Sequence, residues 1–229
     1  AIVVVCVLSA FASAVSAQVA APDVPSIVTR GQAVVRRAPD RVFVTASVES
    51  RSKDPRAAQR QNAEAMAAVQ SALRKADVPD EAVRTTGYSI ERQIDYVDGR
   101  QTLRDYLATN GVEVRLDDVE RTGEVLDLVV QAGATTVSGV RFDLQDRATA
   151  ELEALRLAVV DARARAEAAA TGAGRTLGAI LRIEDAFQPA QPMPMMSFAR
   201  EAADMQVQTP VAPGEIEIRA MVTLTVAIQ

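Results

Sequence analysis

The chain has 229 residues, of which 48% are hydrophobic and 24% are charged, so its composition is that of an ordinary globular protein and not of a disordered one. Acidic residues outnumber basic ones by 30 to 25, and no basic cluster offsets this balance, which argues against a nucleic-acid-binding face. The chain has no histidine and a single cysteine, Cys6, which excludes Ser-His-Asp and Cys-His nucleophile systems and the usual His/Cys zinc site.

Residues 1–17 have the pattern of a secretory signal peptide. They carry no charge, and their apolar run at 2–11 is shorter than the roughly 20 residues of a membrane-spanning helix. Small residues then precede a predicted cleavage site before Gln18. The alternative is a buried N-terminal strand. We therefore expect an exported, periplasmic protein without a membrane span, and we leave open a peripheral association with the envelope, including its outer membrane. The mature chain would contain no cysteine and so no disulfide.

Two strands are predicted after a Pro/Ala linker at residues 18–25. Apolar and polar residues alternate over 26–37 and again over 42–48. Because Ala38-Pro39-Asp40 between them is typical of a turn, we expect these strands to pair as a hairpin. Gly31 would mark a bulge or bend in the first strand.

The first predicted helix begins with Asp54 as N-cap and Pro55 at its first position. Asn62 lies on the apolar face of this helix, where a polar side chain needs a partner. We interpret it as a structural hydrogen-bonding residue that contacts a loop backbone, and not as a catalytic group. The apolar face consists of Ala58, Ala65, Met66, Val69, Ala72, Leu73 and Ala76.

A long hairpin is predicted next, with strands over 83–94 and 101–116 joined by a two-residue turn at Asp98-Gly99. All three tyrosines of the chain lie on these strands. Their phenols could form a binding surface, although packing across the strands is the simpler interpretation. The three are Tyr88, Tyr96 and Tyr106.

A second helix is predicted over 119–132, and Gly133 ends it. The preceding pair Asp117-Asp118 could suggest a cation site, but helix capping accounts for both carboxylates. The side chains expected to point inward are Val125, Leu126, Val129 and Val130.

A strand over 137–144 and the longest helix, over 149–170, follow. Asp143 and Asp146 flank the end of the strand. We interpret them as ordinary solvated acids and not as a cation site, because no third carboxylate is expected near them. Ion pairs four residues apart are predicted on the outside of the helix, Asp161 with Arg165 and Arg163 with Glu167. The predicted buried stripe of this helix is Leu152, Leu155, Val159, Ala162, Ala166 and Ala169.

The last two strands are predicted over 177–183 and 216–228, and five prolines interrupt the segment 187–214 between them. Four of the six methionines lie in this Pro/Met-rich loop. Thioethers suit Cu(I) and are reversibly oxidised, whereas the simpler interpretation is an adaptable apolar loop. These speculative soft-metal or oxidation residues are Met193, Met195, Met196 and Met205.

The order of these elements predicts an α+β fold, with Ala-rich helices packed on one face of largely antiparallel sheets. One domain over 26–229 is expected. The sequence allows a division into two parts near 148–150. This boundary is only weakly indicated, because we expect the last two strands to rejoin the first sheet.

The mature chain resembles the SIMPL-domain family, which includes exported oxidative-stress defence proteins and periplasmic immunogenic proteins. The resemblance rests on the order and spacing of several short motifs. They are Gly31, Pro39-Asp40, Asp54-Pro55 through Ala58 to Asn62, TTGYS at 85–89, Tyr106 with Asn110 and Val112, Gly133-Ala134, Gly139-Val140, Phe142, AVVDARARAEAAA at 158–170 and Leu177-Gly178. Two departures are Arg165, where lysine is common, and Ala33, where a second glycine is frequent. The resemblance implies an α+β fold, an envelope location and, for some members, ring-like oligomers. It implies no catalytic residues.

The leading functional hypothesis is a non-enzymatic, exported envelope protein that self-assembles into a homo-oligomer and contributes to oxidative-stress defence, with no cofactor. The alternative is a periplasmic small-ligand or soft-metal binding module that uses the methionines of the loop. A carboxylate hydrolase has the least support, because no pair of acids is visibly poised. The residues expected to serve structure are Gly31, Pro39, Asp40, Asn62, Asp161 and Gly178.

Overall fold

The computed structural model describes residues 24–97, 99–185 and 209–229, so the predicted signal peptide lies outside the described residues. The fold is α+β, as predicted, with two antiparallel sheets of strand order β1-β7-β6 and β3-β4-β2-β5. The strands are β1 (Ser26–Arg37), β2 (Arg41–Ser52), β3 (Val83–Val97), β4 (Arg100–Leu116), β5 (Thr136–Asp143), β6 (Leu177–Asp185) and β7 (Ile216–Ile228). The helices are α1 (Pro55–Lys75), α2 (Thr122–Gln131) and α3 (Arg147–Gly172), with 3-10 turns η1 (Asp80–Ala82) and η2 (Val119–Arg121).

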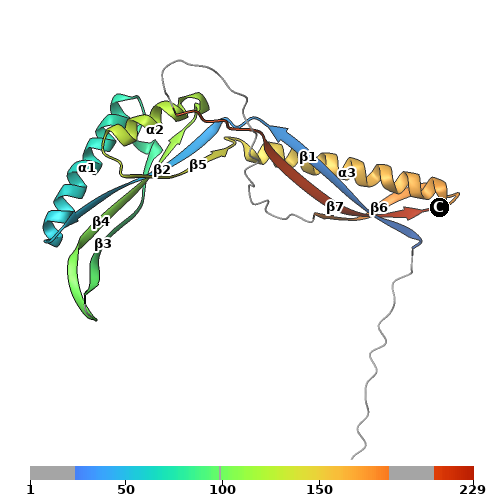
Figure 1. Ribbon diagram of the computed structural model, residues 1–229. Helices are drawn as coiled ribbons and strands as arrows, with labels where there is room; N and C mark the ends of the chain where they lie inside the picture. The colour runs from blue at the N-terminus through green and yellow to red at the C-terminus, as the bar shows by residue number, and fades with distance from the viewer. Residues whose placement is uncertain (1–23, 98, 186–208) are drawn as a thin grey trace, which may run out of the picture.

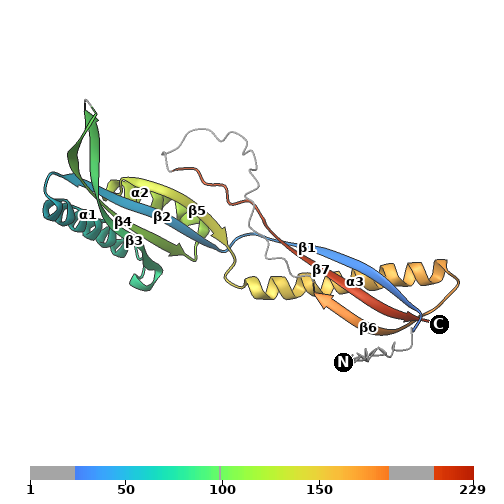
Figure 2. The same cartoon turned by 90° about the horizontal axis from the view of Figure 1, so that it is seen from below.

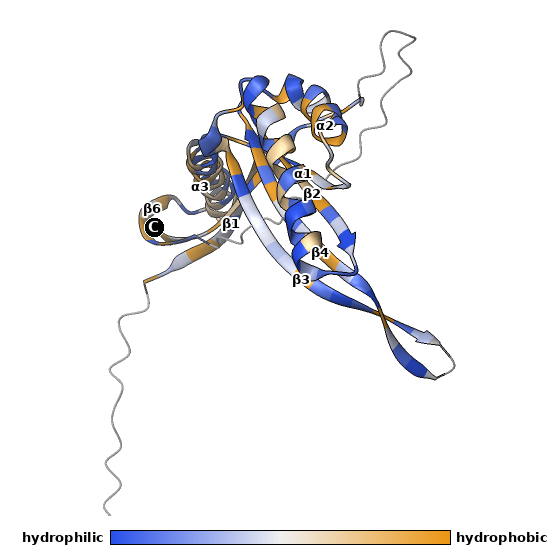
Figure 3. Cartoon of the chain, turned by 90° about the vertical axis from the view of Figure 1, so that its left-hand side faces the viewer, coloured by the Kyte–Doolittle hydropathy of each residue, from blue (hydrophilic) through white to orange (hydrophobic). Residues whose placement is uncertain are grey.

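The two sheets lie end to end in an elongated molecule (Figures 1 and 2). The four-stranded sheet packs against α1 and α2, and the three-stranded sheet packs against α3. The hairpin of β3 and β4 extends beyond α1 and twists as it leaves the sheet (Figure 3). Its turn was predicted correctly, because Val97 pairs with Arg100 and Gly99 has a φ of 74°.

The predicted hairpin of β1 and β2 is wrong. β1 pairs with β7 along its whole length, whereas β2 lies between β4 and β5 in the other sheet. The chain runs on through residues 38–40 instead of reversing (Figure 2). Pro39 has no N–H to offer a hairpin ladder. Asp40 Oδ1 accepts a hydrogen bond from the backbone N–H of Gln145 at 2.7 Å, and its carbonyl accepts one from Gln145 Nε2 at 2.9 Å. These bonds tie together two of the places where the chain crosses between the sheets.

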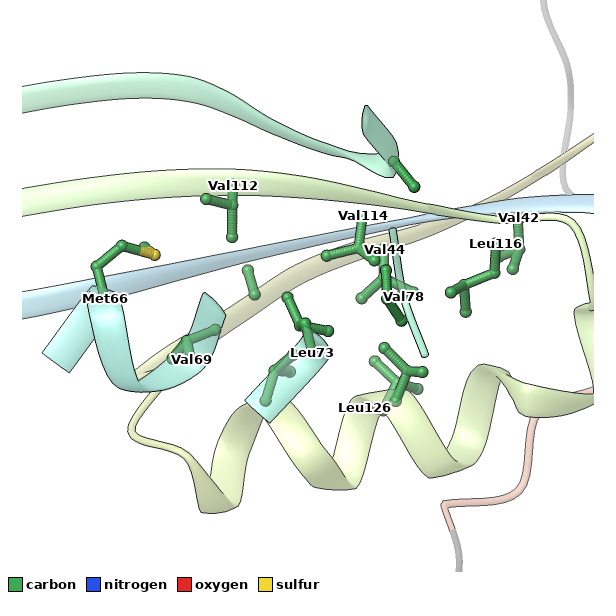
Figure 4. Packing of buried hydrophobic residues seen from close by; sticks show 14 of the residues in the cluster. Val42, Val44, Met66, Val69, Leu73, Val78, Val112, Val114, Leu116 and Leu126 are labelled. Atoms are coloured by element: carbon green, nitrogen blue, oxygen red, sulfur yellow. The ribbon is translucent and has the colours of Figure 1, made fainter. Parts of the chain in front are cut away.

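The main core lies between α1, α2 and the four-stranded sheet (Figure 4). The predicted cap of α1 is present, since the carboxylate of Asp54 accepts a hydrogen bond from the backbone N–H of Arg56 at 2.9 Å. Ala58, Met66, Val69 and Leu73 of the predicted face are buried, and its other three alanines are half-buried. Alternating valines of β2 and β4 complete the core from the sheet side: Val42, Val44, Val48, Val112 and Val114.

The predicted buried stripe of α3 is largely wrong. Leu152 is 52% exposed, Ala169 is exposed, and Leu155 and Val159 are half-buried. Only Ala162 and Ala166 of the predicted stripe are buried. The side that faces β1 and β7 is instead a row of alanines spaced four residues apart. Because an α-helix has 3.6 residues per turn, residues spaced four apart form a row that winds slowly around the helix. Such a row can follow the twist of a sheet. The row consists of Ala150, Ala154, Ala158, Ala162, Ala166 and Ala170.

Gly31 is the point where α3 comes closest to the sheet. The pairing of β1 with β7 is uninterrupted there, so the predicted bulge is absent. A Cβ at Gly31 would lie 2.0 Å from the carbonyl oxygen of Ala158 and 2.7 Å from the Cβ of Ala162. Thr29 Oγ1, two residues earlier, donates a hydrogen bond of 2.8 Å to the carbonyl of Ala162. The small residues on both sides therefore let the helix backbone lie directly on the strand.

Candidate assembly surfaces

No catalytic constellation is apparent in the described part of the chain. Within it, no group of three or more acidic or cysteine side chains is placed to hold a metal ion. The same residues contain no helix long and apolar enough to cross a membrane. A shallow groove between α2 and β5 has one carboxylate, that of Asp127, and this carboxylate already accepts a hydrogen bond of 2.7 Å from Thr209 Oγ1.

Asn62 is fully buried on the inner side of α1. Its Nδ2 donates hydrogen bonds to the carbonyls of Val48 in β2, at 2.8 Å, and Ala108 in β4, at 3.0 Å. Its partners are therefore strand carbonyls and not the loop backbone that we expected. The amide fastens the helix to two neighbouring strands, and a donor held by two carbonyls is not available for chemistry.

The aspartates at the helix starts have separate structural tasks. Of the pair Asp117-Asp118, only Asp118 caps, by accepting a hydrogen bond from the backbone N–H of Glu120 at 3.0 Å, whereas Asp117 pairs with Arg41 at 2.7 Å. Capping therefore does not account for both carboxylates. Asp146 is not simply solvated, because it is the N-cap of α3. The hydroxyl of Thr149, and then its backbone N–H, donate to Asp146 and lower its pKa.

Asp143, at the end of β5, and Asp161, in the middle of α3, both accept hydrogen bonds that hold their carboxylates in place. Burial opposes ionisation of Asp143, but the backbone N–H of Leu144 and the guanidinium of Arg147 outweigh it, so the pKa of Asp143 is lowered. The pKa of Asp161 is lowered first by the backbone N–H of Gln32, at 2.9 Å, and then by Arg165, at 3.0 Å. These low pKa values suit fixed anions and not general acids. The other predicted ion pair of α3, Arg163 with Glu167, is not among the ion pairs of the described residues.

Gly178 lies in β6 beside β7, where an added Cβ would be 3.1 Å from the carbonyl oxygen of Ala227. The pairing of the two strands is irregular at this point, between Leu177 and Ile180. Gly178 thus belongs to the local sheet geometry. The methionines of the Pro/Met-rich loop, Met193, Met195, Met196 and Met205, lie outside the described residues.

The outer part of the β3–β4 hairpin, between Tyr88 and Tyr106, has one apolar face. We call this part the arm. Ile90 is opposite Ala108, a residue of the α1 side. The pairing shifts between Gln93 and Ile94, where β4 has one residue more than β3, so the alternation of β3 continues and places Ile94 and Tyr96 on the same side as Ile90. Gln101, opposite Tyr96, donates a hydrogen bond of 2.8 Å to its hydroxyl. None of the tyrosines is opposite another, so they do not pack as a cross-strand pair. We define the arm face as Tyr88, Ile90, Ile94, Tyr96, Leu103 and Tyr106, of which all but Tyr106 are exposed.

A second apolar surface lies on α3 and β6. Leu152 and Val160 point away from the alanine row, on either side of the exposed Arg156, and Val160 is 63% exposed. On one flank of α3, Asp161 and Glu153 bond to β1, so Leu155 and Val159 lie on the opposite flank, towards β6.

β6 also has exposed apolar side chains, because α3 covers β1 and β7 but hardly reaches this edge strand. Ile180 and Ile183 are opposite the buried Val226 and Leu224 of β7, so they lie on the same side of the sheet as the helix, yet both are exposed. We define the α3–β6 face as Leu152, Leu155, Val159, Val160, Ile180 and Ile183.

The two surfaces were not found by periodicity. The sequence feature that could have predicted the arm face is the alternation of Tyr88, Ile90, Ile94 and Tyr96. These residues lie in the part of the hairpin that extends beyond α1. The sequence feature that could have predicted the exposed apolar residues of α3 is the alanine row. A helix that buries only alanines has its large apolar side chains on the outward side. Val130, predicted to point inward, is likewise exposed, and it lines the groove beside β5.

The chain matches a family model and several known proteins in sequence. Residues 27–226 match the family model SIMPL, described as a protein of unknown function (DUF541). The chain is 27% identical over 213 residues to the 26 kDa periplasmic immunogenic protein of Brucella melitensis, covering 89% of this chain and 84% of that protein. It is 28% identical over 188 residues to the uncharacterized protein YggE of Escherichia coli K12, covering 82% of this chain and 76% of that protein. Because the family model spans nearly all described residues, the chain belongs to the SIMPL family.

Proposed function

We propose that this chain is a non-enzymatic protein of the bacterial periplasm that assembles with copies of itself and contributes to defence against oxidative stress. The observation that supports assembly most directly is the orientation of α3. The helix buries only alanines and leaves Leu152 and Val160 exposed, and the edge strand β6 leaves Ile180 and Ile183 exposed. Clustered apolar residues of this kind on a secreted protein mark a site of association.

Two observations support the periplasmic location. The Brucella relatives are named periplasmic proteins, and they match this chain over 89% of its length. Residues 1–17 have the uncharged, apolar pattern of an export signal. The stress-defence role is proposed from the resemblance to the SIMPL family alone. Nothing in the described residues favours the soft-metal alternative.

The assembly is tested by light scattering on residues 18–229 after size-exclusion chromatography. We expect a mass above that of a dimer at micromolar concentration. The double variant Leu152→Ser/Val160→Ser should lower the mass, because it makes the outward side of α3 polar. Leu157→Ser is the matched control, since Leu157 is an exposed leucine of the same helix on the flank towards β1. A wild-type chain that is monomeric, or a control that lowers the mass as much as the double variant, contradicts the proposal.

The stress role needs a separate test in cells. A strain that lacks the gene is complemented with the wild-type chain, with Leu152→Ser/Val160→Ser or with Leu157→Ser, and survival in hydrogen peroxide is counted. We expect protection from the wild type and the control. Equal survival with and without the wild-type gene contradicts a role in oxidative stress and leaves the assembly measurement unaffected.

A further inference from the structure

The arm face combines exposed apolar and aromatic side chains with a single charge. Tyr88 and Leu103 are about half exposed, and Tyr96 is 72% exposed. Arg92, opposite Tyr106, is the only charged residue among the positions of this face. Tyrosine and arginine both join an apolar body to a polar tip, so they suit the boundary between an apolar layer and a polar one. The arm face therefore has the composition of a surface that meets a bilayer at its interface.

The acidic residues of the described part of the arm lie on its other face. Glu91 and Asp95 alternate along β3 with the residues of the arm face, and Asp105 is opposite Gln93 on the same side. Arg104 also belongs to that side, because its guanidinium pairs with Asp95 at 3.5 Å and with Asp105 at 3.6 Å. A negatively charged surface can thus approach the arm face without meeting a carboxylate of the described arm.

The helix beside the base of the arm begins with basic residues. Lys53, just before α1, donates a hydrogen bond to the carbonyl of Arg104 in the arm. Asn62 faces the sheet on the same side as the arm face, so Arg60, two residues earlier, and Arg56, one turn before it, point away from the sheet. Both arginines are exposed. We define the basic start of α1 as Lys53, Arg56 and Arg60.

These charges run against the usual preference of a helix start. The partial positive charge at a helix N-terminus favours acidic residues there, yet the first turn of α1 contains none, and Glu64 is the first acid within the helix. Asp54 is already used as the N-cap. Arg56 and Arg60 have no ion-pair partner among the described residues. A local preference that a sequence violates without an internal partner indicates a binding role.

We propose that the arm face and the basic start of α1 dock together on the surface of an anionic phospholipid bilayer. Tyr96 and Leu103 enter the interfacial layer, while Arg92 and the basic start of α1 bind lipid phosphates, since guanidinium groups match phosphate oxygens. Apolar insertion and electrostatic attraction reinforce each other at such surfaces. The arm extends beyond α1, so its face is accessible to a surface larger than the protein (Figure 3). This docking uses the proposed periplasmic location but does not depend on the proposed assembly.

The first experiment measures binding of residues 18–229 to phospholipid vesicles by flotation. We expect the chain to bind vesicles of phosphatidylcholine with one third phosphatidylglycerol at least about tenfold more strongly than vesicles of phosphatidylcholine alone. Tyr96→Ser/Leu103→Ser should lose most of this binding. Gln93→Ser/Thr102→Ser, on the other face of the arm, is its matched control and should bind as the wild type does. Far-UV circular dichroism checks that each variant keeps the wild-type fold.

A second pair of variants tests the charges. Arg56→Gln/Arg60→Gln should lower the binding to the anionic vesicles about tenfold, because each basic residue near an anionic surface adds to the attraction. Arg74→Gln/Lys75→Gln removes the same charge from the other end of the same helix and should leave the binding unchanged. Added salt should weaken the binding of the wild type more than that of Arg56→Gln/Arg60→Gln.

Fluorescence reports whether the arm enters the bilayer. The chain has no tryptophan, so a single introduced one is the only indole in the protein. The emission of Tyr96→Trp should shift to shorter wavelength when the anionic vesicles are added, whereas that of Gln93→Trp, on the other face, should not.

Several results would overturn the proposal. They are a wild type that does not bind the anionic vesicles or that binds both kinds equally, an arm variant that binds as well as its control, and an equal shift for both tryptophans. Equal binding of Arg56→Gln/Arg60→Gln and Arg74→Gln/Lys75→Gln contradicts the role of the basic start of α1. If Tyr96→Ser/Leu103→Ser changes only the mass in light scattering, the arm contacts another copy and not a membrane. The masses of the α3 variants are measured without vesicles, so a failure here leaves the proposed assembly unaffected.

Discussion

Adding a single methyl group at Gly31 tests whether α3 depends on direct contact of its backbone with β1. The new Cβ would lie 2.0 Å from the carbonyl oxygen of Ala158, 2.3 Å from the backbone nitrogen of Ala162 and 2.7 Å from its Cβ. Non-bonded carbon atoms are most stable about 3.5–4.0 Å apart, so in Gly31→Ala the helix must retreat by about 1.5 Å.

This retreat has two costs. Overpacking that shifts the backbone costs about 1–3 kcal/mol. The hydrogen bond from Thr29 Oγ1 to the carbonyl of Ala162 stretches beyond its 2.8 Å, which loses about 1 kcal/mol. We therefore expect Gly31→Ala to lower the free energy of unfolding by about 2–4 kcal/mol, a large share of the roughly 5–15 kcal/mol of a typical protein.

The measurement is urea unfolding followed by far-UV circular dichroism, which detects α3. With an m-value of about 1–3 kcal/mol/M, the midpoint should fall by about 1–2 M. The matched control is Gly139→Ala in β5, where an added Cβ has no atom within 4 Å. This change should leave the midpoint unaltered or raise it slightly, because alanine has fewer unfolded conformations than glycine. If the two variants unfold at the same urea concentration, the close approach at Gly31 does not stabilise the protein.

Three further results are expected. Asn62→Ala should lower the free energy of unfolding by about 1–3 kcal/mol, because it removes the donor shared by two strand carbonyls. The control is Gln61→Ala, which changes an exposed neighbour and should have little effect; equal urea midpoints for the two variants would refute this role of Asn62. The pKa of Asp161 is lower in the folded state, so its ionised carboxylate contributes stability above about pH 4, and this contribution is lost as the pH falls through the folded-state pKa. Asp161→Asn should therefore destabilise the protein at pH 7, and its difference in free energy of unfolding from the wild type should be smaller at pH 3. Mass spectrometry of the exported protein should find Gln18 as its first residue; a protein that retains residues 1–17 would contradict the predicted cleavage.

The elements that depend on local chemistry were predictable from the sequence. The bounds of β7, Ile216–Ile228, and of β1, Ser26–Arg37, are those expected from strict alternation. Asp54-Pro55 correctly marks the start of α1, since capping uses atoms within a few residues of each other. The start of α3 was missed by two residues because its N-cap is Asp146, before the predicted Thr149.

Pairing and packing were less predictable, because they depend on residues far apart in the chain. A turn motif at residues 38–40 suggests a reversal, but the partner of β1 is β7, whose sequence begins only at Ile216. The face of α3 was misjudged because hydrophobic periodicity gives weight to leucine and valine, whereas close approach to Gly31 selects alanine. The two apolar faces were missed for the same reason, since whether a large side chain is covered depends on where the neighbouring elements end.

The hydrogen bonds between Asp40 and Gln145 hold the two sheets of one copy at a fixed angle where the chain passes between them. The relative orientation of the two sheets therefore depends on a junction of a few residues. A rotation at this junction would change the direction in which the arm points relative to α3 without altering the packing within either sheet.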